Sequence, residues 1–144
     1  MRPDPLPVLR VTAPGEGTPP GATWSSCLVV GTAVHVSGIT ARGPGGVIRG
    51  GDSVDGQTRA CIETLKARLE AAGGGLHNVV KLVIHLVDME QKAGVNAARA
   101  ALFGPVYPCS TLVGTPALAF PGLLVEVDAV ADLAADLRTA TDLS

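Results

Sequence analysis

The chain has 144 residues, of which 47% are hydrophobic and 17% charged, and its formal net charge is −2 at pH 7. This length and composition predict a single folded domain over residues 1–144 and exclude a disordered chain. The slightly negative charge offers no basic field to nucleic acid, and with 3% aromatic residues few rings remain for base stacking. A small domain with so little charge also favours a homo-oligomer that covers apolar surface.

The cysteines and the N-terminus further restrict the kind of protein and its compartment. Cys27, Cys61 and Cys109 are widely spaced, which argues against both a disulfide framework and a metal site. The N-terminal residues lack the apolar core of a signal peptide, and no window approaches a membrane span. We therefore expect a cytoplasmic protein with reduced thiols and no membrane contact.

The first third of the chain predicts three short strands. Residues 1–20 are rich in proline and predict a loop with one edge strand. Residues 27–37 form two apolar runs around Gly31 and Thr32, which is typical of a hairpin. The Gly-rich loop over 42–51 lacks the Gly-Lys-Ser/Thr sequence of a phosphate-binding loop.

A helix over 52–72 is the clearest predicted element, because its apolar residues recur at helical spacing. Asp52 or Ser53 can cap its start, and three glycines at 73–75 end it. An apolar strand is expected over 79–88.

The last third of the chain predicts a second helix and two strands. The Ala-rich helix covers 89–103 and is stopped by a Gly-Pro pair. The strands cover about 109–117 and 122–131, and the tail over 132–144 is weakly helical or frayed. This order predicts an α+β fold with a mixed sheet of about six strands and two helices on one face. The other face would pack on a copy of the chain.

Two carboxylates interrupt the last apolar strand. Glu126 and Asp128 are two residues apart, so their side chains point to the same face, about 7 Å from each other. An ionised carboxylate out of water is costly, and one of the two can titrate high beside the charge of the other. We favour an acid–base role for Glu126 over a structural ion pair across an interface, and a structural role for Asp128.

Four further side chains are candidates for a site. Cys109, at the mouth of a strand, is either a space-filling residue or a thiol that contacts substrate. His35 shares a strand face with Ser37, and His85 interrupts an apolar strand; each could serve a thiol or simply be a hydrogen-bonded core residue. Trp24 follows a Pro/Gly loop, where a large ring is useful as a lid over a ligand.

Several short motifs occur together in this chain. They are V-H-V-S-G at 34–38, the helical segment at 52–73, V-V-K-L-V-I-H-L-V-D-M at 79–89, V-N at 95–96 and L-V-E-V-D-A-V-A at 124–131. In this order and spacing they resemble the Rid family, the reactive-intermediate deaminases of the YjgF type, over roughly residues 21–131. The resemblance implies a chorismate-mutase-like fold and a homotrimer with active sites between subunits. It also implies hydrolysis of small 2-imino or enamino acids to 2-keto acids and ammonia, without metal or cofactor.

The resemblance assigns roles to individual residues. Trp24 corresponds to the family's stacking aromatic and Ser37 to its site serine. Asn96 corresponds to the asparagine of the V-N pair, and Glu126 to the acid that positions the hydrolytic water. Together with Ser37 and Asn96, the backbone amides near Cys109, Ser110 and Thr111 would hold a substrate oxygen or nitrogen.

One departure from the family bears on the substrate. Where the family has an arginine that grips the substrate carboxylate, this chain reads Pro108-Cys109-Ser110-Thr111, with Cys109 in the arginine's place. Loss of a bidentate ion pair can cost several kcal/mol of binding, or about a thousandfold. The usual glutamine after the Ser-Gly pair is also replaced, by Ile39.

The function expected from these residues is cofactor-free acid–base catalysis on a small imine, enamine or related electrophile, by hydrolysis, dehydration or cyclisation, in specialised metabolism. One alternative is a ligand-binding or regulatory trimer of the same fold without catalysis. A second alternative is an ordinary 2-iminobutanoate or 2-iminopropanoate deaminase.

Overall fold

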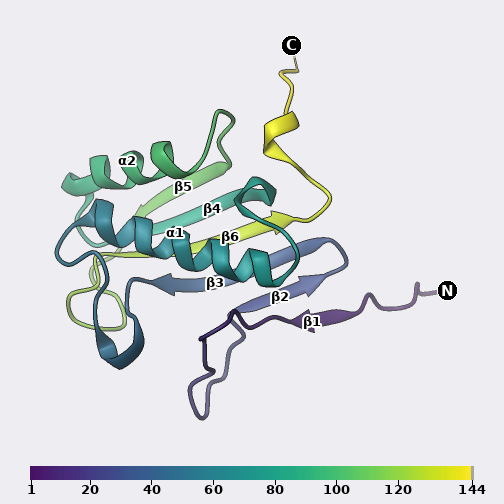
Figure 1. Cartoon of the computed structure of the whole chain (residues 1–144), viewed down its shortest axis with the longest axis horizontal. Helices are drawn as coiled ribbons and strands as arrows, with labels where there is room; N and C mark the ends of the chain where they lie inside the picture. Colours follow the sequence, from purple (N-terminus) through teal and green to yellow (C-terminus); the bar gives the residue numbers. More distant parts are fainter. Residues whose placement is uncertain (144) are drawn as a thin grey trace.

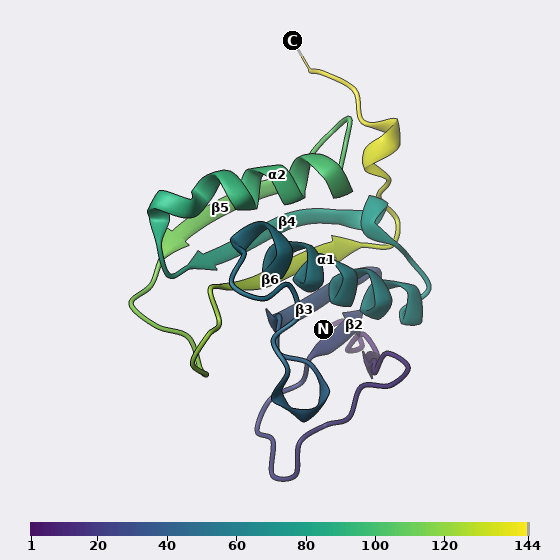
Figure 2. The same cartoon turned by 60° about the vertical axis from the view of Figure 1, so that its left-hand side comes forward.

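The computed structural model describes residues 1–143 and consists of one six-stranded sheet with two α-helices. The strands are β1 (Val8–Arg10), β2 (Cys27–Val30), β3 (Ala33–Thr40), β4 (Val79–Leu86), β5 (Cys109–Gly114) and β6 (Val125–Asp132), and the helices are α1 (Val54–Ala71) and α2 (Lys92–Leu102). Both helices cover the same face of the sheet (Figures 1 and 2). The predicted α+β fold with a mixed six-stranded sheet and two helices is confirmed.

The strand order is β1-β2-β3-β6-β4-β5, with β4 and β5 parallel and the other neighbours antiparallel. Although β5 and β6 are consecutive strands in the chain, β4 lies between them, so residues far apart in sequence share one region of the sheet.

Several element ends differ from the predicted ones. Strand β3 continues to Thr40, three residues past the predicted hairpin. Strand β4 ends at Leu86, because the Asp88 side chain accepts a hydrogen bond from the backbone N–H of Glu90 and starts a short 3₁₀ turn that leads into α2. In the C-terminal tail, a similar cap by Asp136 starts a 3₁₀ turn over Leu137–Thr139.

Helix α1 begins where the sequence predicts. Of the two candidate caps it uses Ser53, whose hydroxyl accepts a hydrogen bond from the backbone N–H of Gly56 at 3.0 Å. After the helix, Gly73 adopts a left-handed backbone with φ of 91°, which most residues avoid.

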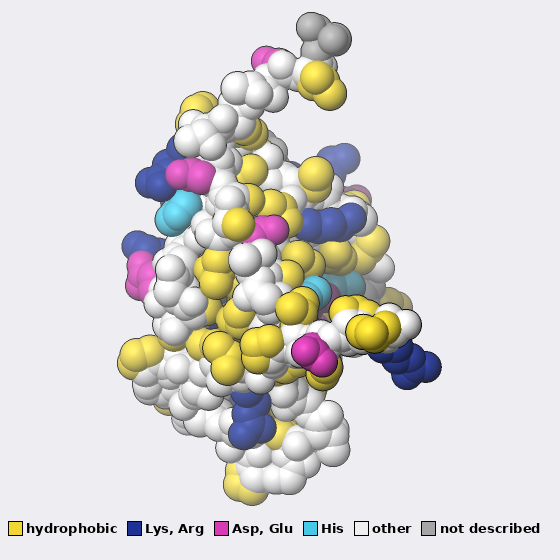
Figure 3. Space-filling view, turned by 90° about the vertical axis from the view of Figure 1, so that its right-hand side faces the viewer, with side chains coloured by type: hydrophobic (Ala, Val, Ile, Leu, Met, Phe, Trp, Pro, Cys, Tyr) yellow, Lys and Arg dark blue, Asp and Glu magenta, His cyan; other side chains and the backbone are white. Residues whose placement is uncertain are grey.

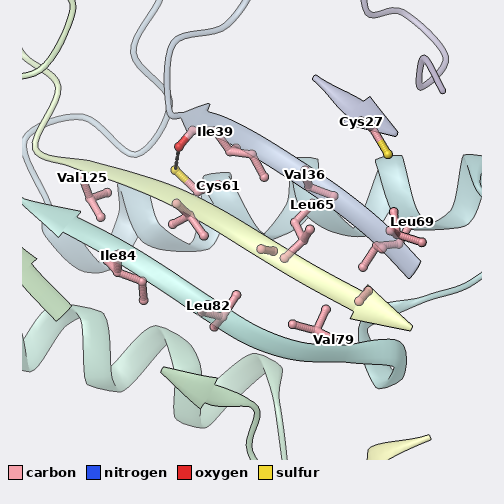
Figure 4. Close-up of a cluster of buried hydrophobic side chains, with 14 of the residues drawn as sticks. Cys27, Val36, Ile39, Cys61, Leu65, Leu69, Val79, Leu82, Ile84 and Val125 are labelled. Carbon is pink, nitrogen blue, oxygen red and sulfur yellow. Dashed lines mark hydrogen bonds between the residues drawn. The ribbon is translucent and has the colours of Figure 1, made fainter. Parts of the chain in front are cut away.

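The core lies between α1 and the sheet (Figure 4). Cys61, Leu65 and Leu69 of α1 pack there, and Figure 4 shows them with strand side chains that include Leu82 and Ile84. Along β6 the buried side chains alternate, and they are Val125, Val127, Ala129 and Ala131. The intervening side chains of β6, Glu126 and Asp128 among them, therefore point to the face that carries no helix. We call this the open face.

The junction before α1 is held by close backbone contact and by one buried amide. Gly50 lies against Gly56, so that a Cβ built on Gly50 would come within 2.3 Å of the Gly56 carbonyl carbon. Gln57 is fully buried and donates to the carbonyl oxygens of Gly51 and Gly122, at 2.7 and 2.9 Å. Its side-chain oxygen accepts from the N–H of Leu124 at 2.9 Å, so this junction also fixes the start of β6.

The surface combines hydrophobic and charged side chains. Across the side shown in Figure 3, hydrophobic side chains recur between isolated acidic and basic groups. None of the helices within residues 1–143 is both long and apolar enough to span a membrane.

Candidate active site

A bulge in β3 brings backbone against the two carboxylates of β6. Val36 pairs with Ala129 and Ile39 with Val127, so Ser37 and Gly38 together oppose the single residue Asp128. Gly38 has a φ of 58°, and its N–H donates to Asp128 Oδ1 at 2.8 Å. A Cβ on Gly38 would lie 3.3 Å from Glu126 Oε1, so glycine permits this approach.

His85 completes a cluster with these acids. It pairs in register with Glu126 across β4 and β6, yet its Nε2 lies 3.3 Å from Oδ2 of Asp128. Asp128 thus contacts both Gly38 and His85. Glu126, in contrast, has no hydrogen-bond partner among residues 1–143.

The environment of Glu126 perturbs its ionisation. Partial burial raises its pKa, the negative charge of Asp128 raises it further, and His85 acts in the opposite direction. A carboxyl group with a raised pKa holds and releases a proton closer to neutral pH, which suits a general acid or base.

The same shift links Glu126 to stability. Because its pKa is raised on folding, the folded chain binds more protons than the unfolded chain, and stability falls as pH rises through the raised pKa. We expect E126Q to be more stable than the wild type at about pH 8, by less than about 1 kcal/mol since solvent screens the site. Near pH 3, where Glu126 is protonated in both states, we expect the gain to vanish.

Urea unfolding at both pH values measures this difference. E63Q, which removes an exposed carboxylate on α1, is the matched control. A gain for E126Q that is equal at the two pH values would contradict the assignment.

Ser37 and Trp24 lie on the N-terminal side of the cluster. The Ser37 hydroxyl donates to the carbonyl oxygen of Ser25 at 3.1 Å, so it fixes the segment that carries Trp24. Trp24 is 58% exposed. It lines a hollow of about 620 Å³, together with Gly38. His35 lines a second hollow of about 490 Å³ on the open face, together with Ser37 and Asp128.

The remaining predicted site residues lie elsewhere in the same chain. Cys109 of β5 pairs with Lys81 of β4, and Glu126 of β6 pairs with His85 of β4. Lys81 and His85 are four residues apart along β4. Two strand spacings and four residues separate Cys109 from Glu126 by roughly 16 Å. Thr111 follows Cys109 on the open face, since it pairs with Val83.

Ser110 and Asn96 belong to the helix side of the sheet. The Ser110 hydroxyl accepts from Arg99 Nη1 of α2 at 2.7 Å, and Asn96 is an exposed residue of α2. One chain therefore brings together Trp24, Ser37 and Glu126 but not Cys109, Ser110 or Asn96.

Sequence reasoning missed the contact between Gly38 and the two acids. The only signal was the Ser-Gly pair inside a strand, where a glycine often marks a bulge. It also missed that Arg42 and Arg49 line the same hollow as Trp24. Within residues 1–143, no three His, Cys, Asp or Glu side chains lie close enough together to hold a metal ion.

Residues 16–133 match the family described as endoribonuclease L-PSP, and the chain belongs to this family, which includes the YjgF and Rid proteins. A RutC family protein of Pyrococcus horikoshii is 32% identical over 114 residues, which cover 78% of this chain and 88% of that protein.

Solved structures of similar fold support the same family assignment. The crystal structure of a protein of unknown function from Pseudomonas aeruginosa has a TM-score of 0.86 at 34% identity, covering 94% of this chain and 99% of that one. RidA from the Antarctic bacterium Psychrobacter sp. PAMC 21119 has a TM-score of 0.75 at 29% identity, covering 86% of this chain and 98% of that one. The resemblance to the Rid family inferred from the motifs is confirmed.

Proposed function

We propose that this protein is an enzyme that acts on a small reactive imine or enamine by acid–base catalysis, with Glu126 as the proton-transferring group. The observation that supports this most directly is the carboxylate itself: Glu126 has a raised pKa, faces the open side of the sheet and has no hydrogen-bond partner among residues 1–143, although Asp128 and His85 are close. A structural ion pair would require a basic partner, and none lies within 4.0 Å of Glu126 among residues 1–143.

Hydrolysis of an imine illustrates the chemistry. Glu126 accepts a proton from a water molecule as the water oxygen bonds to the C=N carbon, and it then gives this proton to the nitrogen, which completes a carbinolamine. Transfer of the hydroxyl proton to the nitrogen through Glu126 and cleavage of the C–N bond then give the carbonyl product and ammonia or an amine. Asp128 and His85 keep the local charge and geometry fixed, and Trp24 covers the ligand.

The site is proposed to be completed by a second copy of the chain within a homotrimer. Cys109, Ser110, Thr111 and Asn96 would come from the neighbouring subunit, since they lie far from Glu126 in their own chain. The uncovered sheet face supports this arrangement, because it presents apolar side chains such as Leu28, Val83 and Val130 beside the polar cluster. A cytoplasmic location and a role in specialised metabolism remain predictions.

The same residues leave two other functions to be tested. Cys109 carries no charge that could replace the family's arginine, which weighs against an ordinary 2-imino acid deaminase that grips the substrate carboxylate at this position. A ligand-binding trimer would keep the hollow beside Trp24 but would show no turnover. An endoribonuclease is disfavoured by the net charge of −2, which provides no basic stripe for RNA.

Imine lifetime in the presence of the protein tests the proposal. 2-Iminobutanoate and an uncharged imine of the same carbon skeleton would be generated in situ and trapped as semicarbazones. We expect the protein to slow trapping of at least one of them by consuming it. No effect on either would remove imine hydrolysis from consideration.

C109R restores the family's arginine and tests the substrate assignment. If the rest of the site is intact, we expect C109R to raise turnover of 2-iminobutanoate by about tenfold or more, because a bidentate pair with a carboxylate is regained. C109S, which keeps the size without the charge, is the control. An equal rise in both variants would contradict a role for the lost guanidinium.

A further inference from the structure

The hollow beside Trp24 has a charge that the proposed chemistry does not use. It lies along the second half of β3, between α1, the loop that follows β1 and the loop that follows β3, and these two loops project from the same end of the molecule (Figure 2). Arg10, Arg42, Arg49 and Arg68 line it, together with the two acidic residues Glu16 and Glu63.

Of these four arginines, Arg68 is paired with an acidic side chain. Arg68 is 8% exposed, and its Nε lies 2.9 Å from Glu16 Oε1. Within residues 1–143, Arg42 and Arg49 have no carboxylate within 4.0 Å. Arg42 and Arg49 are therefore not ion-paired among residues 1–143, and Glu63, which also lines the hollow, lies more than 4.0 Å from both guanidinium groups.

Arg49 is fixed at the wall of the hollow. Its Nη2 donates to the Thr64 hydroxyl at 2.6 Å and to the carbonyl oxygen of Ala60 at 3.2 Å, both on α1. Its Nε is buried and has no partner among residues 1–143. A partly buried charge held only by neutral groups is poorly compensated, and a bound anion would compensate it.

Arg42 is held by the same loop. It forms an antiparallel bridge with Ile48, and the N–H of Arg49 donates to the carbonyl oxygen of Ala41 at 2.9 Å. The guanidinium carbon of Arg42 lies 4.0 Å from the centre of the Phe120 ring. Both arginines are thus positioned before any ligand arrives, which lowers the entropic cost of binding.

The hollow also adjoins the proposed catalytic acid. Gly38 and Thr40 line it, Gly38 approaches Glu126, and Thr40 is the register partner of Glu126. A small molecule with one end beside Glu126 could place its other end in the hollow.

We infer that this hollow binds the carboxylate group of the substrate through Arg42 and Arg49, with Trp24 against the apolar part. This inference rests on the proposed function in placing the reactive carbon beside Glu126, whereas the binding of a carboxylate does not. It gives the chain a guanidinium clamp on the β3–α1 loop in place of the one missing at Cys109.

Tryptophan fluorescence tests the inference, because Trp24 is the only tryptophan in the chain. The probes are 2-oxobutanoate, a stable analogue of the 2-imino acid, and its uncharged amide. We expect a saturable change with the acid and a dissociation constant at least tenfold higher for the amide. R42Q and R49Q should each weaken binding of the acid by about tenfold or more.

Two further variants make the result specific. R49K keeps the positive charge and should regain part of the affinity. R59Q removes an arginine that pairs with Asp55 on α1, outside the hollow, and should bind as the wild type does. The inference is overturned if acid and amide bind equally, if R42Q and R49Q bind the acid unchanged, or if no saturable change occurs.

The test also separates this inference from the proposed function. E126Q should still bind 2-oxobutanoate in an arginine-dependent way. Arginine-dependent binding in a protein that consumes no imine would support the anion site and remove the proposed activity. If the protein consumes an imine but R42Q and R49Q bind 2-oxobutanoate as the wild type does, the proposed activity is supported and the anion site is removed.

Discussion

E126Q is expected to lower kcat for imine consumption by about 10²- to 10⁴-fold, the usual contribution of a positioned acid–base group. Glutamine has nearly the same shape as glutamate but cannot exchange a proton at neutral pH, so the variant removes the chemistry and keeps the packing. Because Glu126 has no hydrogen-bond partner among residues 1–143, the substitution breaks no hydrogen bond within that part of the chain.

The assay is steady-state turnover of whichever imine the wild type consumes, with circular dichroism to confirm folding. D128N, which changes the second carboxylate of the cluster, is the comparison variant. D128N alters the carboxylate that contacts Gly38 and His85. It should lower turnover less than E126Q does, because Asp128 acts only by positioning Gly38 and His85. A kcat of E126Q within about threefold of the wild type would show that Glu126 is not the proton-transferring group.

G50A is expected to lower the free energy of unfolding by about 3 kcal/mol or more. Gly50 has a φ of 80°, and a left-handed backbone alone costs a residue with a Cβ about 1–2 kcal/mol. In addition, the new Cβ would lie 2.3 Å from the carbonyl carbon of Gly56 and 2.5 Å from the nitrogen of Gln57. These are backbone atoms of α1, so relief requires the helix or the loop to move.

G51A provides the matched control for urea unfolding. Gly51 also has a positive φ, 59°, but a Cβ there would meet no heavy atom within 4 Å. We expect G51A to cost about 1–2 kcal/mol, the backbone term alone. Equal losses in the two variants would show that the close approach of Gly50 to α1 contributes nothing.

Much of the architecture could be predicted because it depends on local patterns. Helical spacing of apolar residues located α1, and strand alternation placed Glu126 and Asp128 on one face. Five short motifs in the right order and spacing, that around Ser37 among them, indicated the family, and the family implies the fold.

Other features depend on contacts that no local pattern encodes. The insertion of β4 between β5 and β6 follows from packing of the whole sheet, and it separates Cys109 from Glu126. The bulge at Gly38 depends on Asp128, ninety residues away. Arg42 and Arg49 lie in a Gly-rich loop without periodicity, so only the folded chain shows that they border the same hollow as Trp24.

The roughly 16 Å between Cys109 and Glu126 has a consequence for how activity would respond to dilution. If each catalytic centre needs both the region around Glu126 and the region around Cys109 from a second subunit, an isolated subunit lacks a working centre even when it is folded. Activity per chain would then fall as the protein is diluted below the dissociation constant of the assembly. Protein abundance would itself act as a control on the reaction.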